Sequence, residues 1–378
     1  MTDSIRTIKL HDIRVSENTL WRHLVVETAD GVTGTGEYTL GNAGPNLQSD
    51  AARLLRPFLG KAPSPALARP PEGAGLETCA ILSALEQALC DVEAAQQGRP
   101  VWQSLAPETA PAPLHIYANI NRRTEDRSPA GFEASARLAM RQGFRHFKVA
   151  PFDDLVPEIC GTAEGRARID AGLARVAAVA GCLAPDLSLM VDCHWRFTPD
   201  AAAETLAALA DMGVGWFECP LPEVTDNIAA LANLRALAHA HDMRLAGLEM
   251  SVSPDQVLPF LKAGAYDVIM PDVKYAGGCH GILEMAKLAR GYGTAVSIHN
   301  PSGPIAHMAS VHTALALDNG QLLEMQFDES PMFTSIVSEM VLPEAGTVVP
   351  PAAPGLGCAL TPQAIAGATS LDVAGDTA

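Results

Sequence analysis

The chain is poor in positive charge and has no long apolar run. Its 378 residues include 26 Lys and Arg against 43 Asp and Glu, which gives a formal net charge of −17. Such a surface repels phosphate backbones and anionic lipid, so we expect neither nucleic-acid nor membrane partners. Since no run of 18 apolar residues occurs and no basic N-terminal region precedes an apolar stretch, we expect neither a membrane span nor an export signal.

Paired cysteine motifs are also missing. The eight cysteines are scattered, with no CxxC pair and no zinc-type spacing. We therefore expect reduced thiols in a cytoplasmic protein rather than a disulfide framework. Hydrophobic residues make up 48% of the chain, enough to bury a large core. The length favours two domains, or one large barrel with an addition.

The first part of the chain predicts a small α+β unit. Residues 5–37 alternate apolar and polar positions and turn at Asp30-Gly31, which is typical of a β-hairpin. A connection rich in Pro, Ala and Gly (58–75) leads to a stretch from residue 80 whose apolar residues recur at helical spacing. We assign residues 1–113 to this N-terminal unit.

From about residue 114, short apolar strands alternate with amphipathic helices. Eight strands in this rhythm favour a closed parallel (β/α) barrel over an open sheet, so the fold class is α/β. The barrel is expected to span 114–330, and the Pro- and Gly-rich tail 331–378 to return to the N-terminal unit. The strands are expected near residues 115–120, 145–150, 187–192, 214–219, 244–249, 267–271, 294–298 and 321–325.

Polar groups follow the barrel strands where each strand ends. A parallel barrel places its functional residues at the carboxyl ends of its strands. Charges selected only for solubility would be scattered along the helices, whereas these all follow apolar runs at one level. From the second strand to the eighth, the ends carry Lys148, Asp192 with His194, Glu218, Glu249, Asp272, His299 and Glu324.

Three carboxylates on consecutive strands predict a metal site. Asp192, Glu218 and Glu249 offer hard oxygen ligands, which suit Mg²⁺ with open positions for water or substrate. Taken singly, each would more often be a turn residue or a helix cap. Their shared position at the barrel mouth favours metal binding over a role as turn residues or helix caps.

The remaining strand ends predict acid–base chemistry. Asp272 beside His299 would fix the tautomer of the imidazole and raise its basicity, as a general base requires. His194, on another part of the rim, would then be free to act as an acid on a leaving group. Lys148 can pair with a substrate carboxylate or its enolate.

Together these residues resemble the enolase superfamily, and within it the mandelate racemase-like branch. The segment 30–37 resembles a strand pair of the family's capping domain, and 83–92 with 98–105 resembles its characteristic helix. The resemblance implies a modified (β/α)7-8 barrel with an N-terminal α+β capping domain. It also implies that Mg²⁺ is bound by the three carboxylates, that Asp272 and His299 form the dyad, and that Glu324 hydrogen-bonds the substrate carboxylate.

Three positions depart from the family pattern. Many members carry Lys-x-Lys on the second strand, but here Lys148 is followed by Val and Ala150, so a second base is absent. Lys274 lies two residues beyond Asp272, which occupies the position of the base lysine in the muconate-lactonizing branch, so Lys274 is not read as that base. Leu248 stands before Glu249 where a glycine is usual.

A single second-strand lysine with a third-strand histidine is similar to the sugar-acid dehydratases of the superfamily. The resemblance implies a Mg²⁺-dependent lyase that removes the α-proton of an aldonate or aldarate and eliminates water, giving a 2-keto-3-deoxy acid. The alternative is a racemase, epimerase or lactone cycloisomerase that acts through the same enolate. A barrel that binds sugar acids without catalysis remains a third interpretation.

Substrate selection is expected to come from the N-terminal unit closing over the barrel. The segment 16–21, which contains Asn18 and Trp21, is the expected lid, joined by Tyr38 and the loop 151–154. Its other interpretation is an ordinary connection between strands. Apolar helix faces and the habit of the family favour a homo-oligomer.

Overall fold

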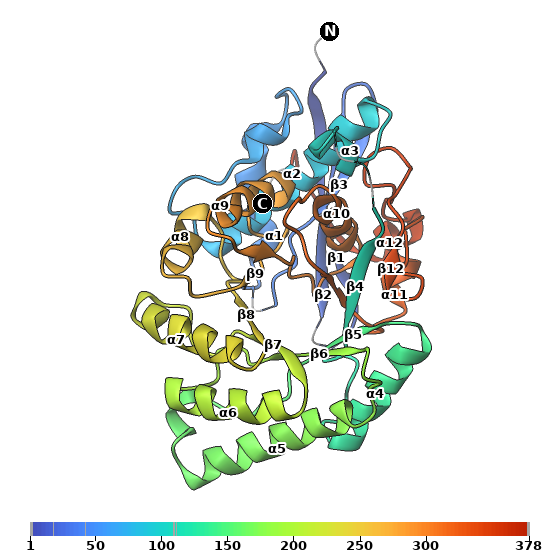
Figure 1. Cartoon of the computed structure of the whole chain (residues 1–378). Helices are drawn as coiled ribbons and strands as arrows, with labels where there is room; N and C mark the ends of the chain where they lie inside the picture. Colours follow the sequence, from blue (N-terminus) through green and yellow to red (C-terminus); the bar gives the residue numbers. More distant parts are fainter. Residues whose placement is uncertain (1–2, 18, 42, 109, 111, 376–378) are drawn as a thin grey trace.

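The structure is a computed structural model that describes residues 3–375 except 18, 42, 109 and 111. Asn18, expected in a lid, therefore lies outside the described residues. The chain forms an N-terminal unit built on an antiparallel sheet and a barrel of parallel strands ringed by helices (Figure 1). None of the helices described is long and apolar enough to cross a membrane.

The antiparallel sheet has the order β13-β1-β2-β3. Its strands are β1 (Ile5–Arg14), β2 (Leu20–Thr28), β3 (Thr33–Glu37) and β13 (Thr369–Asp372), so the end of the chain pairs with its beginning. The hairpin between β2 and β3 turns at Gly31, whose φ of 87° favours glycine. Short elements complete the unit: α1 (Leu47–Leu55), η1 (Arg56–Phe58), η2 (Pro65–Ala68) and α3 (Val101–Leu105).

Helix α2 (Leu76–Gln96) covers this sheet at very close range. A Cβ atom on Gly36 would lie 1.9 Å from the carbonyl oxygen of Ala84, and one on Gly34 would lie 2.1 Å from that of Ala88. Only glycine allows the backbone of β3 to approach the helix this closely. This close contact fixes α2 against β3.

Eight parallel strands form the barrel in the order β10-β9-β8-β7-β6-β5-β4-β11. A parallel bridge between Val296 and Gly320 joins β10 to the segment leading into β11. The predicted fold class is confirmed. The strands are β4 (Leu114–Asn119), β5 (His146–Val149), β6 (Ser188–Asp192), β7 (Val214–Glu218), β8 (Arg244–Gly247), β9 (Val268–Ile269), β10 (Ala295–Val296) and β11 (Leu323–Gln326).

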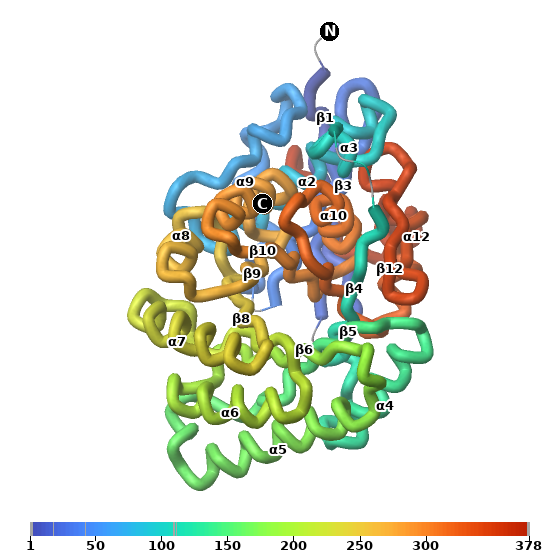
Figure 2. Tube along the Cα trace, in the orientation of Figure 1, coloured from blue at the N-terminus to red at the C-terminus, as the bar shows by residue number. Residues whose placement is uncertain are grey.

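The connecting helices surround these strands, as the path of the chain in Figure 2 shows. Several begin with Ser or Thr followed by Pro, and the hydroxyl of Ser128 accepts the Gly131 N–H as an N-cap of α4. Inside the barrel, Tyr117, Met190, Trp216 and Met270 fill the centre. The helices are α4 (Pro129–Arg141), η3 (Pro157–Ile159), α5 (Ala163–Ala180), α6 (Pro199–Asp211), η4 (Thr225–Asn227), α7 (Ile228–His239), α8 (Pro254–Lys262), α9 (Gly278–Arg290) and α10 (Pro304–Leu315).

The N-terminal unit docks on the barrel through carboxylates placed at helix N-termini. Glu37 accepts the N–H groups of Gly303 and Ala306, at 2.9 and 3.0 Å, where α10 begins. Glu86 accepts the N–H groups of Cys279 and His280, at 2.7 and 3.1 Å, where α9 begins. Both contacts satisfy backbone donors that the helices themselves leave unpaired.

The tail runs back across both units. It contains α11 (Met332–Ser335), β12 (Thr347–Val348), which pairs with β4, and α12 (Pro362–Gly367). Further along, the Leu356 N–H donates to the Asp91 carboxylate of α2 at 2.8 Å. The tail thus ties the barrel to the N-terminal unit before ending as β13.

Candidate active site at the barrel mouth

Three carboxylates meet where β6, β7 and β8 end. Asp192 is the last residue of β6, Glu218 is the last of β7, and Glu249 follows β8 by two residues. One carboxylate oxygen of each lies within 4.8 Å of the others, and all three side chains are buried. The parallel strands bring these acids together because their carboxyl ends share one edge.

The backbone at these strand ends is bent into an unusual conformation. His194, Cys219 and Leu248 have φ values of 47°, 44° and 68°, in the left-handed region that favours glycine. Each lies within two residues of one of the three carboxylates. Such backbone costs about 1–3 kcal/mol per residue and tends to occur at functional sites.

Leu248 keeps its strained backbone through a buried carboxylate. Its N–H donates to Glu223, which also accepts the hydroxyl of Tyr266 at 2.9 Å. Burial raises the pKa of Glu223 to about 7. The left-handed φ of Leu248 is a conformation that glycine adopts at less cost than leucine.

Each carboxylate of the cluster contacts one basic side chain. Asp192 Oδ2 lies 2.9 Å from His194 Nε2, and Glu249 Oε2 lies 3.6 Å from His299 Nε2. Glu218 accepts the amine of Lys148. The basic groups therefore surround the space between the carboxylates rather than filling it.

Burial and mutual repulsion make two carboxylates of the cluster, those of Glu218 and Glu249, hard to ionise. Burial raises the pKa of Glu218 to about 8, and the nearby Asp192 and Glu249 charges add to the effect. Burial also raises the pKa of Glu249. The His194 imidazole, by contrast, lowers the pKa of Asp192 against the effect of burial. Three buried oxygen ligands, two of which resist ionisation, fit a hard divalent cation.

His299 and Asp272 form a hydrogen-bonded pair beside the cluster. His299 Nδ1 lies 2.9 Å from Asp272 Oδ2, so Nε2 is turned toward Glu249. Burial works to lower the pKa of His299, but the Glu249 carboxylate and the Asp272 hydrogen bond outweigh it and raise the pKa. Lys274 Nζ lies 2.7 Å from Asp272 Oδ2 and 2.6 Å from Ser302 Oγ, so this lysine is held in a buried ion pair.

Glu324 lies in the eighth barrel strand, β11, in contact with three neighbours. Its Oε1 accepts from Asn119 at 2.6 Å and lies 3.0 Å from Lys148 Nζ, while its Oε2 accepts the Asn300 N–H at 2.9 Å. Burial opposes ionisation, but Lys148 outweighs it and lowers the pKa of Glu324. Glu324 contacts Lys148 directly, and the hydrogen bond to a substrate carboxylate that the resemblance implies for it stays a prediction.

The aromatic residues expected in a lid are buried. Tyr38 is fully buried in the core of the N-terminal unit, with its hydroxyl 3.5 Å from Asp12, so its assignment to a lid is wrong. Trp21 is 1% exposed and packs edge-on against Phe333 of the tail at 6.3 Å between ring centroids. In the loop 151–154, Phe152 is buried. A sequence of mixed polarity does not show which side of the capping sheet these aromatic rings face.

Two contributors to the site were missed from the sequence. Asn119 ends the first barrel strand and orients Glu324, so the rule that found the other seven strand ends also applied to it. Tyr275 places its hydroxyl 3.4 Å from His299 Nδ1. No strand end marks Tyr275, because it lies in the turn between β9 and α9.

Comparison with known proteins supports this assignment of fold and family. Curated relatives include D-gluconate dehydratase of Thermoproteus tenax, 27% identical over 348 residues that cover 88% of this chain and 68% of that protein. D-xylonate dehydratase of Haloferax volcanii is also 27% identical, with 96% of this chain and 89% of the relative covered. D-galactonate dehydratase of Ralstonia pickettii is 27% identical, with 89% and 88% covered.

Solved structures share the whole architecture. An enolase superfamily member from Salmonella Typhimurium aligns over 98% of this chain and 99% of its own, with a TM-score of 0.86 at 20% identity. A mandelate racemase/muconate lactonizing enzyme from Jannaschia sp. aligns over 96% and 97%, with a TM-score of 0.83 at 22% identity. The family model described as Enolase C-terminal domain-like matches residues 131–364. With these matches, the chain belongs to the Enolase C-terminal domain-like family, within the enolase superfamily that its strand-end residues predict.

Proposed function

We propose that this protein is a lyase that removes water from a sugar acid to give a 2-keto-3-deoxy acid. One observation carries the proposal: two imidazoles, His194 and His299, approach the same carboxylate cluster from strands four places apart in the sheet. Dehydration needs a base for the α-proton and an acid for the departing hydroxyl. Two separated imidazoles can serve these two roles.

Asp192, Glu218 and Glu249 are the residues that would hold Mg²⁺, which their oxygen donors favour. When bound, the ion supplies positive charge that lowers the cost of forming the enediolate of a carboxylic acid. Lys148 adds a second positive charge at the same place. Its amine is fixed between Glu218 and Glu324, so it needs little reorganisation to bind a substrate carboxylate.

His299 is the proposed base. Its Nδ1 is bonded to Asp272, which leaves Nε2 toward the cluster to accept the α-proton. Asp272 in turn is held by Lys274, so the imidazole has a fixed orientation. A positioned base of this kind contributes about 10²- to 10⁴-fold to the rate.

His194 is the proposed acid for the 3-hydroxyl. The Asp192 carboxylate raises the pKa of His194, which favours an imidazole that carries a proton. Directly after β5, the position that could carry a second base lysine is Ala150, which is buried and has no proton to exchange. This arrangement supports elimination over two-base racemisation.

The relatives narrow the class of substrate. The three dehydratases above are named for D-gluconate, D-xylonate and D-galactonate, all sugar acids with hydroxyls at C2 and C3. We infer that this protein acts on an aldonate or aldarate of the same kind. Identities near 27% are too low to carry over the stereochemistry of any one of them.

The test is a panel of sugar acids assayed with Mg²⁺ for 2-keto acid, in parallel with α-deuterium exchange in D2O. We expect the His194→Asn variant to lose product formation by about 10²- to 10⁴-fold while exchange is retained. His241→Asn, in the exposed turn after α7, is the matched control and should behave as the parent. Absence of both turnover and exchange across the panel, or equal loss of both in His194→Asn, would contradict the proposed roles.

A further inference from the structure

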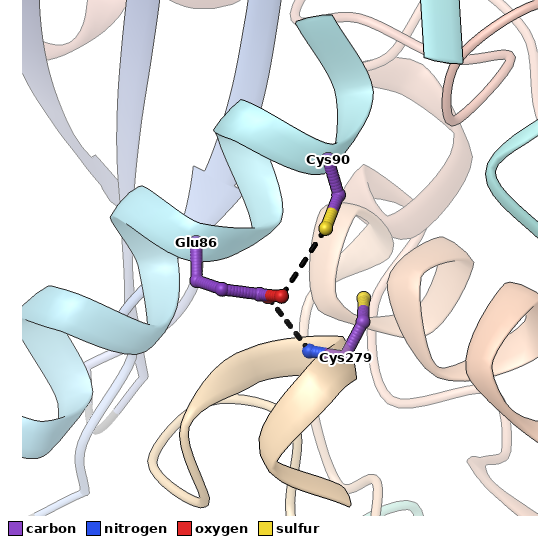
Figure 3. A group of neighbouring side chains, drawn as sticks. All are labelled: Glu86, Cys90 and Cys279. Atoms are coloured by element: carbon purple, nitrogen blue, oxygen red, sulfur yellow. Dashed lines mark hydrogen bonds between the residues drawn. The ribbon is translucent and has the colours of Figure 1, made fainter. Parts of the chain in front are cut away.

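A second group of metal-ligand side chains lies between the N-terminal unit and the barrel, where α2 meets the start of α9. Glu86 and Cys90 project from α2, and Cys279 lies in the first turn of α9; the three side chains point toward one another (Figure 3). One potential ligand atom of each lies within 4.8 Å of the others, and all three residues are buried. Residues four apart on a helix share a face, so α2 presents its two donors to α9 together.

His280 adds a fourth donor to this group. Its Nδ1 lies 2.6 Å from Glu86 Oε1 and 3.6 Å from Cys90 Sγ, and Cys90 Sγ lies 3.2 Å from the same Glu86 oxygen. Ligands around a tetrahedral zinc ion stand about 3.4–3.8 Å apart, given bond lengths of about 2.0–2.3 Å. The two distances from the thiol are close to this range, and the half-exposed His280 has freedom to move outward.

We propose that Glu86, Cys90, Cys279 and His280 bind one Zn²⁺ ion. Two thiolates, an imidazole and one carboxylate form a set of soft and borderline donors that favours zinc over magnesium. The proposal does not depend on the function proposed for the barrel mouth.

The helix-capping role of Glu86 does not account for the group. Capping requires only the carboxylate, which accepts the N–H groups of Cys279 and His280. Two buried thiols and an imidazole around one of its oxygens add nothing to that role. Capping instead fixes Glu86 so that Oε1 faces the other donors.

The site has a route to solvent. A cavity of about 900 Å³ lies between α2, α8 and α9, and both Glu86 and His280 line it. An ion could therefore enter without separation of the two units. Once bound, it would cross-link α2 to α9, which begins six residues after Asp272.

The test is the zinc affinity of the intact, reduced protein, measured by competition with a chromophoric chelator. Excess Mg²⁺ is present to compete for the carboxylate cluster at the barrel mouth. We expect one tightly bound zinc per chain. The Cys90→Ser/Cys279→Ser double variant should bind at least about 100-fold more weakly, since even changes behind metal ligands cost 10- to 100-fold. Cys182→Ser is the matched control. Cys182 is half-buried and lies outside the group, so this variant should bind zinc like the parent.

Co²⁺ loaded into the parent protein supplies a readout that needs no variant to fold. We expect a sulfur-to-cobalt charge-transfer band with tetrahedral visible bands, and a weaker charge-transfer band in Cys279→Ser. Zinc binding that survives the double substitution but disappears in Glu218→Gln would assign the ion to the barrel mouth. That outcome, or a cobalt spectrum without sulfur bands, would overturn the proposal whether or not sugar acids are dehydrated.

Discussion

Histidines behave in opposite ways at the barrel mouth and on α10. The Asp192 carboxylate raises the pKa of His194 to about 9, whereas burial lowers the pKa values of His307 and His312 on α10 to about 4. His312 Nδ1 accepts the Trp102 N–H at 3.1 Å, which requires that nitrogen to be unprotonated. The contrast shows that a carboxylate partner raises the pKa of an imidazole, whereas burial without such a partner lowers it.

Carboxylates follow the same contrast. Glu37 faces the backbone N–H groups of Gly303 and Ala306 at the start of α10, which satisfy it without any cation. Glu218 and Glu249 face each other across the barrel mouth, and their pKa values are raised. Glu37 therefore joins the two units, whereas Glu218 and Glu249 repel each other and would be stabilised by a bound cation.

The largest expected effect comes from replacing His299 at the barrel mouth. His299→Asn should lower kcat by about 10²- to 10⁴-fold because it removes the base for the α-proton. Both product formation and α-deuterium exchange should fall together. His312→Gln is the matched change on α10, and a loss of activity at pH 7 as large as that of His299→Asn would break the comparison.

Replacing a carboxylate of the mouth should weaken Mg²⁺ binding. Glu249→Gln removes one of three charged oxygen ligands, and we expect an affinity loss of more than about 100-fold by calorimetric titration. Glu37→Gln removes a buried carboxylate that has no part in the cluster. Equal losses in the two variants would show that Glu249 acts through the fold rather than on the ion.

Acid should destabilise the protein through the histidines of α10. Their folded pKa of about 4 lies below the unfolded value of 6.5, so the stability they contribute is complete above pH 6.5 and is lost as the pH falls toward 4. Each can account for about 3 kcal/mol. His312→Gln should flatten the pH dependence of the urea midpoint between pH 6.5 and 4, whereas the exposed His241→Gln should leave it steep.

The smallest effect is expected at the junction of the two units. Glu37→Gln leaves one of the two N–H groups at the start of α10 facing an amide –NH2, which costs about 1–3 kcal/mol of unfolding free energy. A lower urea midpoint is the readout, with Glu125→Gln on the surface as control. An unchanged midpoint would mean that the carboxylate is not needed to hold the N-terminal unit on the barrel.

The prediction from sequence was most accurate where one local rule repeats. Each barrel strand is a short apolar run, and the residue that ends it must lie at the mouth, so Asp192, Glu218 and Glu249 could be expected to meet before any coordinates existed. Asn119 obeys the same rule and was overlooked because it carries no charge. Leu248, which stands where the family usually has glycine, has a φ of 68°, a conformation that glycine adopts at less cost.

Prediction was weakest where segments far apart in the chain meet. Cys90 and Cys279 are separated by 189 positions, so no spacing motif could relate them, yet α2 and α9 bring their thiols together. Tyr38 was assigned to a lid because the alternation along β3 does not say which face of the sheet meets α2. The sequence likewise does not show that Lys148 and Asn119 contact the carboxylate of Glu324.

The sequence by itself therefore determined the order of strands and helices, the parallel barrel and the residues at its mouth, because hydrophobic periodicity and strand ends are local properties. Only the tertiary structure decided which charges face one another. It placed Lys148 between two carboxylates, turned Nε2 of His299 toward Glu249, and gathered two thiols around Glu86. Electrostatic partners depend on distances of a few ångströms between segments remote in the chain, and these distances exist only after the chain has folded.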